Sequence, residues 1–138
     1  MTAEPVYTLG ILRLAASLPL DTSLADPHGR AEKRSATCGS VIATEVRLDD
    51  GRLADVAQKV QACAFGQASS ALLGRFAPHR SPIEIVAARV AIRSWLAGSG
   101  EPPAGFEVLE PARSKTGRHG AILLPFDALI AALRDAGA

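Results

Sequence analysis

Three side chains in this sequence could bind a soft metal or carry sulfur: Cys38, Cys63 and His119. Thiolate sulfur and imidazole nitrogen are ligands that proteins offer to zinc and to iron. Two thiolates and one imidazole would supply three of the four ligands of a tetrahedral site. The three residues are far apart in the chain, so their spacing alone is weak support. Such a site depends on the fold to bring them together.

Cys63 is expected where a strand ends and a helix begins. Residues 53–62 alternate as in a half-buried strand, and the residues after Cys63 show one apolar stripe at helical spacing. The unpaired N–H groups and the positive dipole end of a helix favour a thiolate at such a position. The alternative is a buried cysteine that acts as a small hydrophobic residue. Ser69 and Ser70 are expected to bond to backbone groups in the first helical turns.

The segments before Cys63 predict a small antiparallel sheet. Residues 41–48 alternate, and Asp49-Asp50-Gly51 is a strong hairpin turn ahead of the return strand. Cys38 and Cys63 are about equally far from this turn, so an antiparallel register would place them at the same end of the sheet. The mixed charges of residues 30–34 favour a solvated edge strand, with a partner-docking patch as the alternative. The sheet would then have about three strands.

The remaining apolar segments predict helices, which makes the fold class α+β. Residues 7–18 suit an amphipathic helix that ends before a proline. Ser81-Pro82-Ile83-Glu84 is a capping box with proline at the first helical position, and Gly98 can end that helix in a left-handed conformation. Residues 119–133 carry apolar side chains at helical spacing. Within them, Pro125 fits only near the first turn or at a kink.

The segment between the last two helices is polar and rich in glycine and proline. Residues 98–105 read as a loop, and residues 106–109 as a short turn of helix that stops near Pro111. Arg113, Lys115 and Arg118 flank His119 on its N-terminal side. Solvated loop charges are the expected explanation for these three residues, and a role in favouring nearby thiolates is the alternative.

The composition limits the classes of function. The chain has 138 residues, of which 48% are hydrophobic and 21% charged, which predicts one globular domain over residues 1–138. The net charge of +1 argues against nucleic acid or an anionic membrane as the main partner. The first residues lack the features of a signal peptide, and no apolar run approaches membrane-spanning length. We therefore expect a cytoplasmic protein whose two cysteines are thiols rather than a disulfide.

Four segments occur in an order that resembles the NifU/IscU/SufU family of iron–sulfur cluster assembly scaffolds. They are Thr37-Cys38-Gly39-Ser40, residues 50–55, residues 63–70 and residues 118–123. The resemblance spans about residues 6 to 133. It implies a three-stranded antiparallel sheet with about four to five helices packed on one face. It also implies a scaffold that binds iron or an iron–sulfur cluster, is not an enzyme, and works with a cysteine desulfurase and with iron–sulfur acceptor or chaperone proteins.

The resemblance also implies a ligand set. In that family three cysteines hold the cluster or a zinc ion, with an aspartate near the first cysteine and sometimes a histidine before the third. By position, Cys38 and Cys63 are the first two cysteines and His119 is the histidine. Ser40 stands at the aspartate position and Gly120 at that of the third cysteine. A [2Fe–2S] cluster needs four ligands, so here it would be labile or shared across a homodimer. Zinc with one water would complete a tetrahedron.

Three functions compete on this basis. The first is a scaffold, or a sulfur- and iron-accepting protein, in iron–sulfur cluster assembly. The second is a zinc-binding accessory protein that docks a cysteine desulfurase without building clusters. The third is a thiol enzyme with Cys63 as nucleophile and His119 as base. No recognised oxyanion loop and no orienting acid support the third function, so we expect a protein that is not an enzyme.

Overall fold

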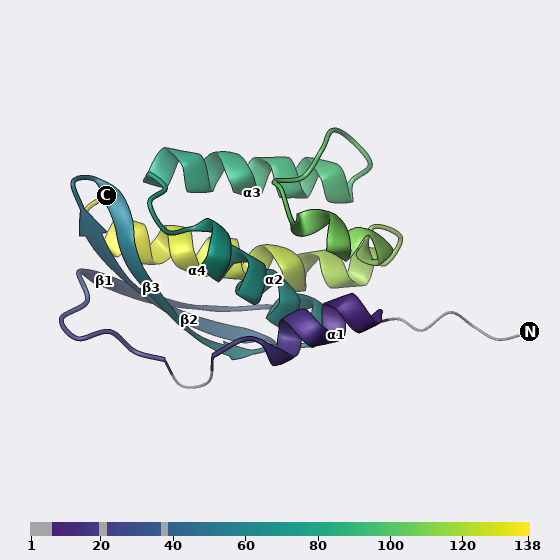
Figure 1. Ribbon diagram of the computed structural model, residues 1–138, viewed down its shortest axis with the longest axis horizontal. Coiled ribbons are helices and arrows are strands. Elements are labelled where there is room, and N and C mark those ends of the chain that lie inside the picture. The colour runs from purple at the N-terminus through teal and green to yellow at the C-terminus, as the bar shows by residue number, and fades with distance from the viewer. Residues whose placement is uncertain (1–6, 20–21, 37–38) are drawn as a thin grey trace, which may run out of the picture.

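The computed structural model describes residues 7–19, 22–36 and 39–138. One helix is followed by three consecutive strands and then by the remaining helices, and this segregation of strands and helices confirms the α+β class (Figure 1). In the described part of the chain, no helix is both long and apolar enough to cross a membrane. The elements, in chain order, are α1 (Leu9–Ala16), β1 (Gly29–Arg34), β2 (Val41–Asp49), β3 (Arg52–Gln61), α2 (Ala64–Phe76), α3 (Pro82–Leu96), the 3₁₀ helices η1 (Phe106–Ala112) and η2 (Thr116–Arg118), and α4 (His119–Asp135).

The three strands form one antiparallel sheet in the order β1-β2-β3. The predicted hairpin joins β2 to β3, and its turn has left-handed backbone at Asp50 and Gly51, with φ of +53° and +76°. Two such residues suit the twist of a tight hairpin. The predicted edge strand is confirmed as β1. Val41 pairs with Gln61, so the beginning of β2 lies beside the end of β3.

One face of the sheet carries the helices. Ile42 and Val46 of β2 are buried on that face, among side chains of α4 and the main core. The other face of β2 is crossed by the segment of residues 22–28, where Arg47 donates a hydrogen bond to the carbonyl oxygen of Ala25. The helices therefore pack on one face, as the family resemblance implied.

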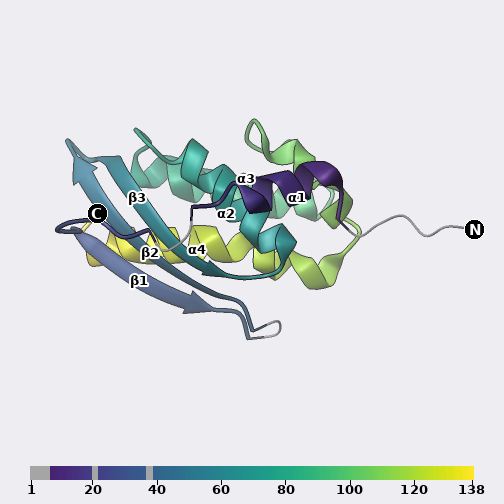
Figure 2. The ribbon, with the colours of Figure 1, turned by 60° about the horizontal axis from the view of Figure 1, so that its bottom comes forward.

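The helices form two layers above the sheet (Figures 1 and 2). α2 and α4 contact the strands, and α3 packs on α4. Three phenylalanine rings, Phe65, Phe106 and Phe126, are fully buried in the core. The ring centroids of Phe106 and Phe126 are 5.7 Å apart. This core holds α2 and α4, the two helices whose first residues include or adjoin predicted ligands.

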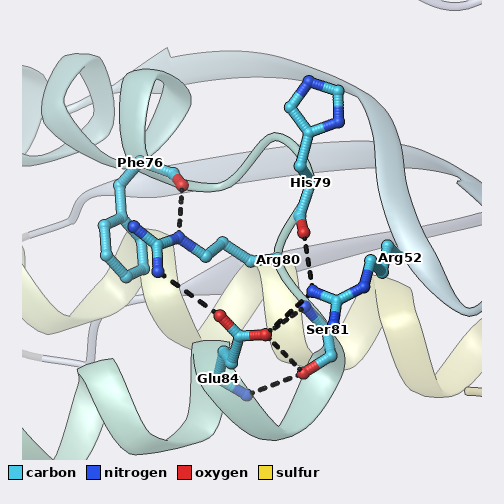
Figure 3. Close-up of polar contacts among 6 residues, drawn as sticks. All are labelled: Arg52, Phe76, His79, Arg80, Ser81 and Glu84. Carbon is cyan, nitrogen blue, oxygen red and sulfur yellow. Dashed lines mark hydrogen bonds and ion pairs between the residues drawn. The ribbon is translucent and has the colours of Figure 1, made fainter.

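The beginning of α3 is held by the predicted capping box (Figure 3). The hydroxyl of Ser81 accepts a hydrogen bond from the backbone N–H of Glu84, and the Glu84 carboxylate forms ion pairs with Arg52 at 3.0 Å and Arg80 at 3.3 Å. The pKa of Glu84 is lowered, first because the backbone N–H of Ser81 donates to its carboxylate and then because Arg80 does. At the other end, Gly98 has φ of +104°, which confirms the predicted left-handed end of the helix.

Candidate metal centre

Cys63 lies at the predicted junction of a strand and a helix. It directly precedes α2 as the N-cap residue, with extended backbone, and its carbonyl oxygen accepts the N–H of Gln67 at 2.9 Å. Its thiol is free and makes no capping hydrogen bond. The side chain is half-buried, with one side against the hydrophobic core. Cys63 is therefore not sealed inside the protein.

His119 is the first residue of α4, and its side chain is also half-buried. The ring nitrogen Nε2 lies 2.9 Å from the carbonyl oxygen of Ala112 and 3.1 Å from that of Arg113. These two carbonyl groups belong to the C-terminal end of η1 and to the residue that follows it. The imidazole is thus held against the backbone of the preceding segment through one of its two nitrogens.

The beginnings of α2 and α4 are in contact (Figure 2). Gly66 permits this, because a Cβ atom there would lie 2.7 Å from the Cβ of Ala62 and 3.2 Å from the carbonyl oxygen of Ala121. Gly66 is three residues after Cys63, and Ala121 is two residues after His119. The close approach therefore links the two helix starts that carry the predicted ligands.

A buried hydrogen bond joins the same two helices farther along. The hydroxyl of Ser69 donates to the carbonyl oxygen of Ile122 at 2.7 Å. The hydroxyl of Ser70 is also buried, and it has no hydrogen-bond partner among the described residues. The prediction that both serines bond to backbone groups of the first helical turns is therefore wrong. These serines are the sixth and seventh residues of α2, beyond the four backbone N–H groups that a helix start leaves without partners.

Cys38 lies outside the described residues, so its predicted place at the start of the middle strand stays a prediction. Val41, three residues after Cys38 in the sequence, pairs with Gln61, two residues before Cys63. Among the residues that the structure describes, no group of three or more His, Cys, Asp or Glu side chains is placed to hold a metal ion. Two of the three predicted donors are therefore described, and both lie at helix starts that touch.

The two positions at which the chain departs from the family pattern differ in their surroundings. Ser40, at the aspartate position, is 3% exposed. Gly120, at the position of the third cysteine, faces open space, because a Cβ atom there would meet none of the other described residues within 4 Å, its two chain neighbours and its own helix backbone apart. A thiol at position 120 would therefore fit without a clash, although this chain has none.

Arg113 differs from the prediction of a solvated loop charge. Its Nε donates to the carbonyl oxygen of Trp95 at 2.9 Å, and its guanidinium carbon lies 5.1 Å from the centre of the Trp95 ring. Lys115 is exposed, as predicted. The structure thus adds Gly66 to the residues that shape this region, and it gives Ser69 and Arg113 other contacts than the sequence predicted. Gly66 had a signal in the sequence, since glycine is disfavoured inside a helix unless close packing requires it.

The sequence matches no protein-family model and no curated protein. Its fold does resemble those of solved structures. A nitrogen-fixing NifU-like protein (N-terminal) from Brucella abortus is 34% identical, with 96% of this chain and 94% of that chain covered and a TM-score of 0.88. A putative iron–sulfur cluster assembly scaffold protein for the SUF system from Fervidobacterium islandicum AW-1 is 18% identical, with 93% and 96% covered and a TM-score of 0.82.

A hypothetical protein has the same architecture, with 21% identity, 91% of this chain and 94% of that chain covered, and a TM-score of 0.80. At such low identity, this protein and the one from F. islandicum show the fold alone. The similarity to the B. abortus protein is higher and extends over nearly the whole of both chains. It confirms the resemblance found in the sequence, and this chain belongs to the NifU/IscU/SufU family.

Proposed function

We propose that this protein is a scaffold, or a sulfur- and iron-accepting protein, in iron–sulfur cluster assembly. One observation carries the proposal: the free thiol of Cys63 and the imidazole of His119 sit at two helix starts that touch. Cys38 is the proposed second thiol. Membership of the NifU/IscU/SufU family, which the similarity to the B. abortus protein shows, supports the same role.

The donor set suits a cargo that is held weakly. An iron–sulfur cluster takes four ligands, usually thiolates. Cys38, Cys63 and His119 would supply three of them, while Gly120 offers none. The fourth position would be filled by water, by a second copy of the chain or by another protein. A cluster bound in this way is readily passed to an acceptor protein, which is what a scaffold has to do.

The proposed sulfur donor is a cysteine desulfurase. Cys63 is half-buried rather than fully buried, as a residue that receives sulfur from another protein has to be. In the transfer, the Cys63 thiolate attacks the outer sulfur of a persulfide on the donor, and the donor cysteine leaves as a thiolate. The protein itself then acts as a carrier rather than an enzyme. Acceptor or chaperone proteins for iron–sulfur clusters are the proposed recipients.

Anaerobic reconstitution with ferrous iron and sulfide tests the scaffold role. We expect visible charge-transfer absorption that Cys38→Ser and Cys63→Ser abolish and that His119→Ala weakens. His79→Asn is the matched control, because His79 is exposed and asparagine tolerates its φ of +70°. This control should reconstitute like the wild type. A wild-type protein that stays colourless under these conditions would overturn the proposal.

A second candidate function is a zinc protein that docks a cysteine desulfurase without building clusters. The open space at Gly120 favours it, because one missing thiolate matters less to zinc, which accepts an imidazole and a water. Metal analysis of freshly purified protein separates the two functions when combined with reconstitution. Stoichiometric zinc without cluster formation supports this second function, and protein free of both zinc and iron defeats it.

A further inference from the structure

The partners of the His119 ring determine which of its nitrogens can bind a metal. Nε2 lies within hydrogen-bonding distance of two oxygen atoms, those of Ala112 and Arg113. Both are backbone carbonyl oxygens, which only accept hydrogen bonds, so Nε2 must carry the hydrogen. In the neutral imidazole the lone pair then lies on Nδ1. We infer that Nδ1 is the nitrogen that binds the metal. This inference rests on the proposed function, in which His119 is a ligand.

The two carbonyl groups have fixed positions because the end of η1 is closed by backbone hydrogen bonds. The N–H of Arg113 donates to the carbonyl oxygen of Glu110 at 3.0 Å, and the N–H of Lys115 donates to that of Ala112 at 2.9 Å. The carbonyl oxygen of Ala112 therefore accepts from both Lys115 and His119, which uses its two lone pairs.

The Arg113 side chain connects this end of η1 to α3. Its Nε donates to the backbone carbonyl of Trp95, and its guanidinium lies over the indole ring. Trp95 is only 6% exposed and belongs to the last turn of α3, so it is a rigid anchor. The geometry assigns Arg113 as a positioning residue: it holds the carbonyl groups that orient His119, and it acts through that ring rather than as a ligand.

Loss of this anchor should act through the ring of His119. Outer partners that orient a histidine ligand change metal affinity by about 10- to 100-fold when they are removed. We expect Arg113→Ala to weaken zinc binding by about tenfold, because the end of η1 is then free to shift and the ring loses its fixed orientation. Lysine at position 113 can still donate to the Trp95 carbonyl but cannot stack on the ring in the same way. The zinc affinity of Arg113→Lys should therefore lie between that of the wild type and that of Arg113→Ala.

Arg80 offers a matched control. Its Nε donates to the carbonyl oxygen of Phe76 at 3.3 Å, and its guanidinium carbon lies 4.2 Å from the centre of the Phe76 ring. Arg80→Ala therefore removes the same kind of contact at a place that does not touch His119. We expect Arg80→Ala to lower the melting temperature and to leave zinc affinity unchanged.

Two measurements on the full chain test the inference. In the metal-free protein at neutral pH, ¹⁵N NMR of the histidine side chains should show His119 with hydrogen on Nε2, and added zinc should shift the Nδ1 resonance. Zinc affinity of the wild type, Arg113→Ala, Arg113→Lys and Arg80→Ala is then measured by competition with a chromophoric chelator. If Arg113→Ala does not fold, the zinc affinity of Arg113→Lys tests the role of Arg113, and the wild-type NMR spectrum tests the assignment of Nδ1.

The outcomes separate this inference from the proposed function. Hydrogen on Nδ1, or zinc bound through Nε2, overturns the inference and leaves the scaffold role intact. An Arg113→Ala protein with wild-type zinc affinity and a lowered melting temperature shows that Arg113 is only structural, which overturns its assignment as a positioning residue. A wild-type protein that takes up neither zinc nor a cluster defeats the proposed function. It also overturns the inference that Nδ1 binds a metal.

Discussion

Ser69 on α2 donates its hydroxyl hydrogen to the carbonyl oxygen of Ile122 on α4, across 2.7 Å in the buried interior. One turn earlier on α2, Gly66 lies against Ala121 of α4. Together these two contacts set the separation of the helix starts that carry Cys63 and His119. Changes in the contact between α2 and α4 should therefore affect both stability and metal binding.

Ser69→Ala should destabilise the protein, and Ser70→Ala should not. Removing the Ser69 hydroxyl loses one buried hydrogen bond, which lowers the free energy of unfolding by about 1 kcal/mol. The Ser70 hydroxyl is equally buried but has no hydrogen-bond partner in the part of the chain that the structure describes, so its removal is expected to be neutral or stabilising. Urea unfolding of both variants measures the difference. Equal losses of stability in the two variants would contradict this account.

Gly66→Ala should lower both stability and metal affinity. The added methyl group would lie 2.7 Å from the Cβ of Ala62, so the backbone has to shift, which destabilises by about 1–3 kcal/mol. Gly74→Ala in the same helix is the control, since its nearest neighbour, Gln58 Nε2, is 3.5 Å away. Alanine there should stabilise by about 0.5–1 kcal/mol. Thermal unfolding and zinc competition would test both variants, and a Gly66→Ala protein as stable as the wild type would refute the close approach.

Glu84→Gln should remove a pH-dependent part of the stability (Figure 3). The folded-state pKa of Glu84 is lowered below its ordinary value of 4.5, first by the Ser81 backbone N–H and next by Arg80. A lowered folded-state pKa adds stability that is fully present above the unfolded-state pKa and is lost as the pH falls through the folded-state pKa. At pH 7 the variant should therefore have a lower free energy of unfolding than the wild type. This difference in the free energy of unfolding should become smaller below about pH 4.5.

Unfolding by urea at neutral and acidic pH measures this gap. Glu101→Gln is the control, because Glu101 is an exposed residue of the loop after α3. Its stability should follow the wild type at every pH. A gap between Glu84→Gln and the wild type that stays constant on acidification would count against a lowered pKa.

Gly120→Cys should strengthen the metal centre. The new side chain would point into open space, so the variant should fold like the wild type. A third thiolate next to His119 should raise zinc affinity and slow the loss of a reconstituted cluster to a chelator. Gly117→Cys is the matched control, because position 117 is equally open but is not a family ligand position. If both thiols have the same effect, position 120 is not part of the centre.

Several parts of the fold could be predicted because their causes are local. The turn at residues 49–51 needs residues that tolerate left-handed backbone, and Asp50-Gly51 provides them. The capping box of α3 lies within four consecutive residues. Alternation of apolar side chains marks the buried face of β2. Each of these features depends on neighbours in the chain, and each is confirmed.

The arrangement around the candidate site has a different origin. By itself, the sequence determined that Cys63 stands at a strand-to-helix junction and that a last helix begins near His119, because periodicity and turn residues are read along the chain. Only the tertiary structure decided that Ser69 bonds to α4 and that Arg113 stacks on Trp95. Those contacts depend on which helix faces meet, and that choice is made by the packing of the whole core rather than by any short stretch of residues.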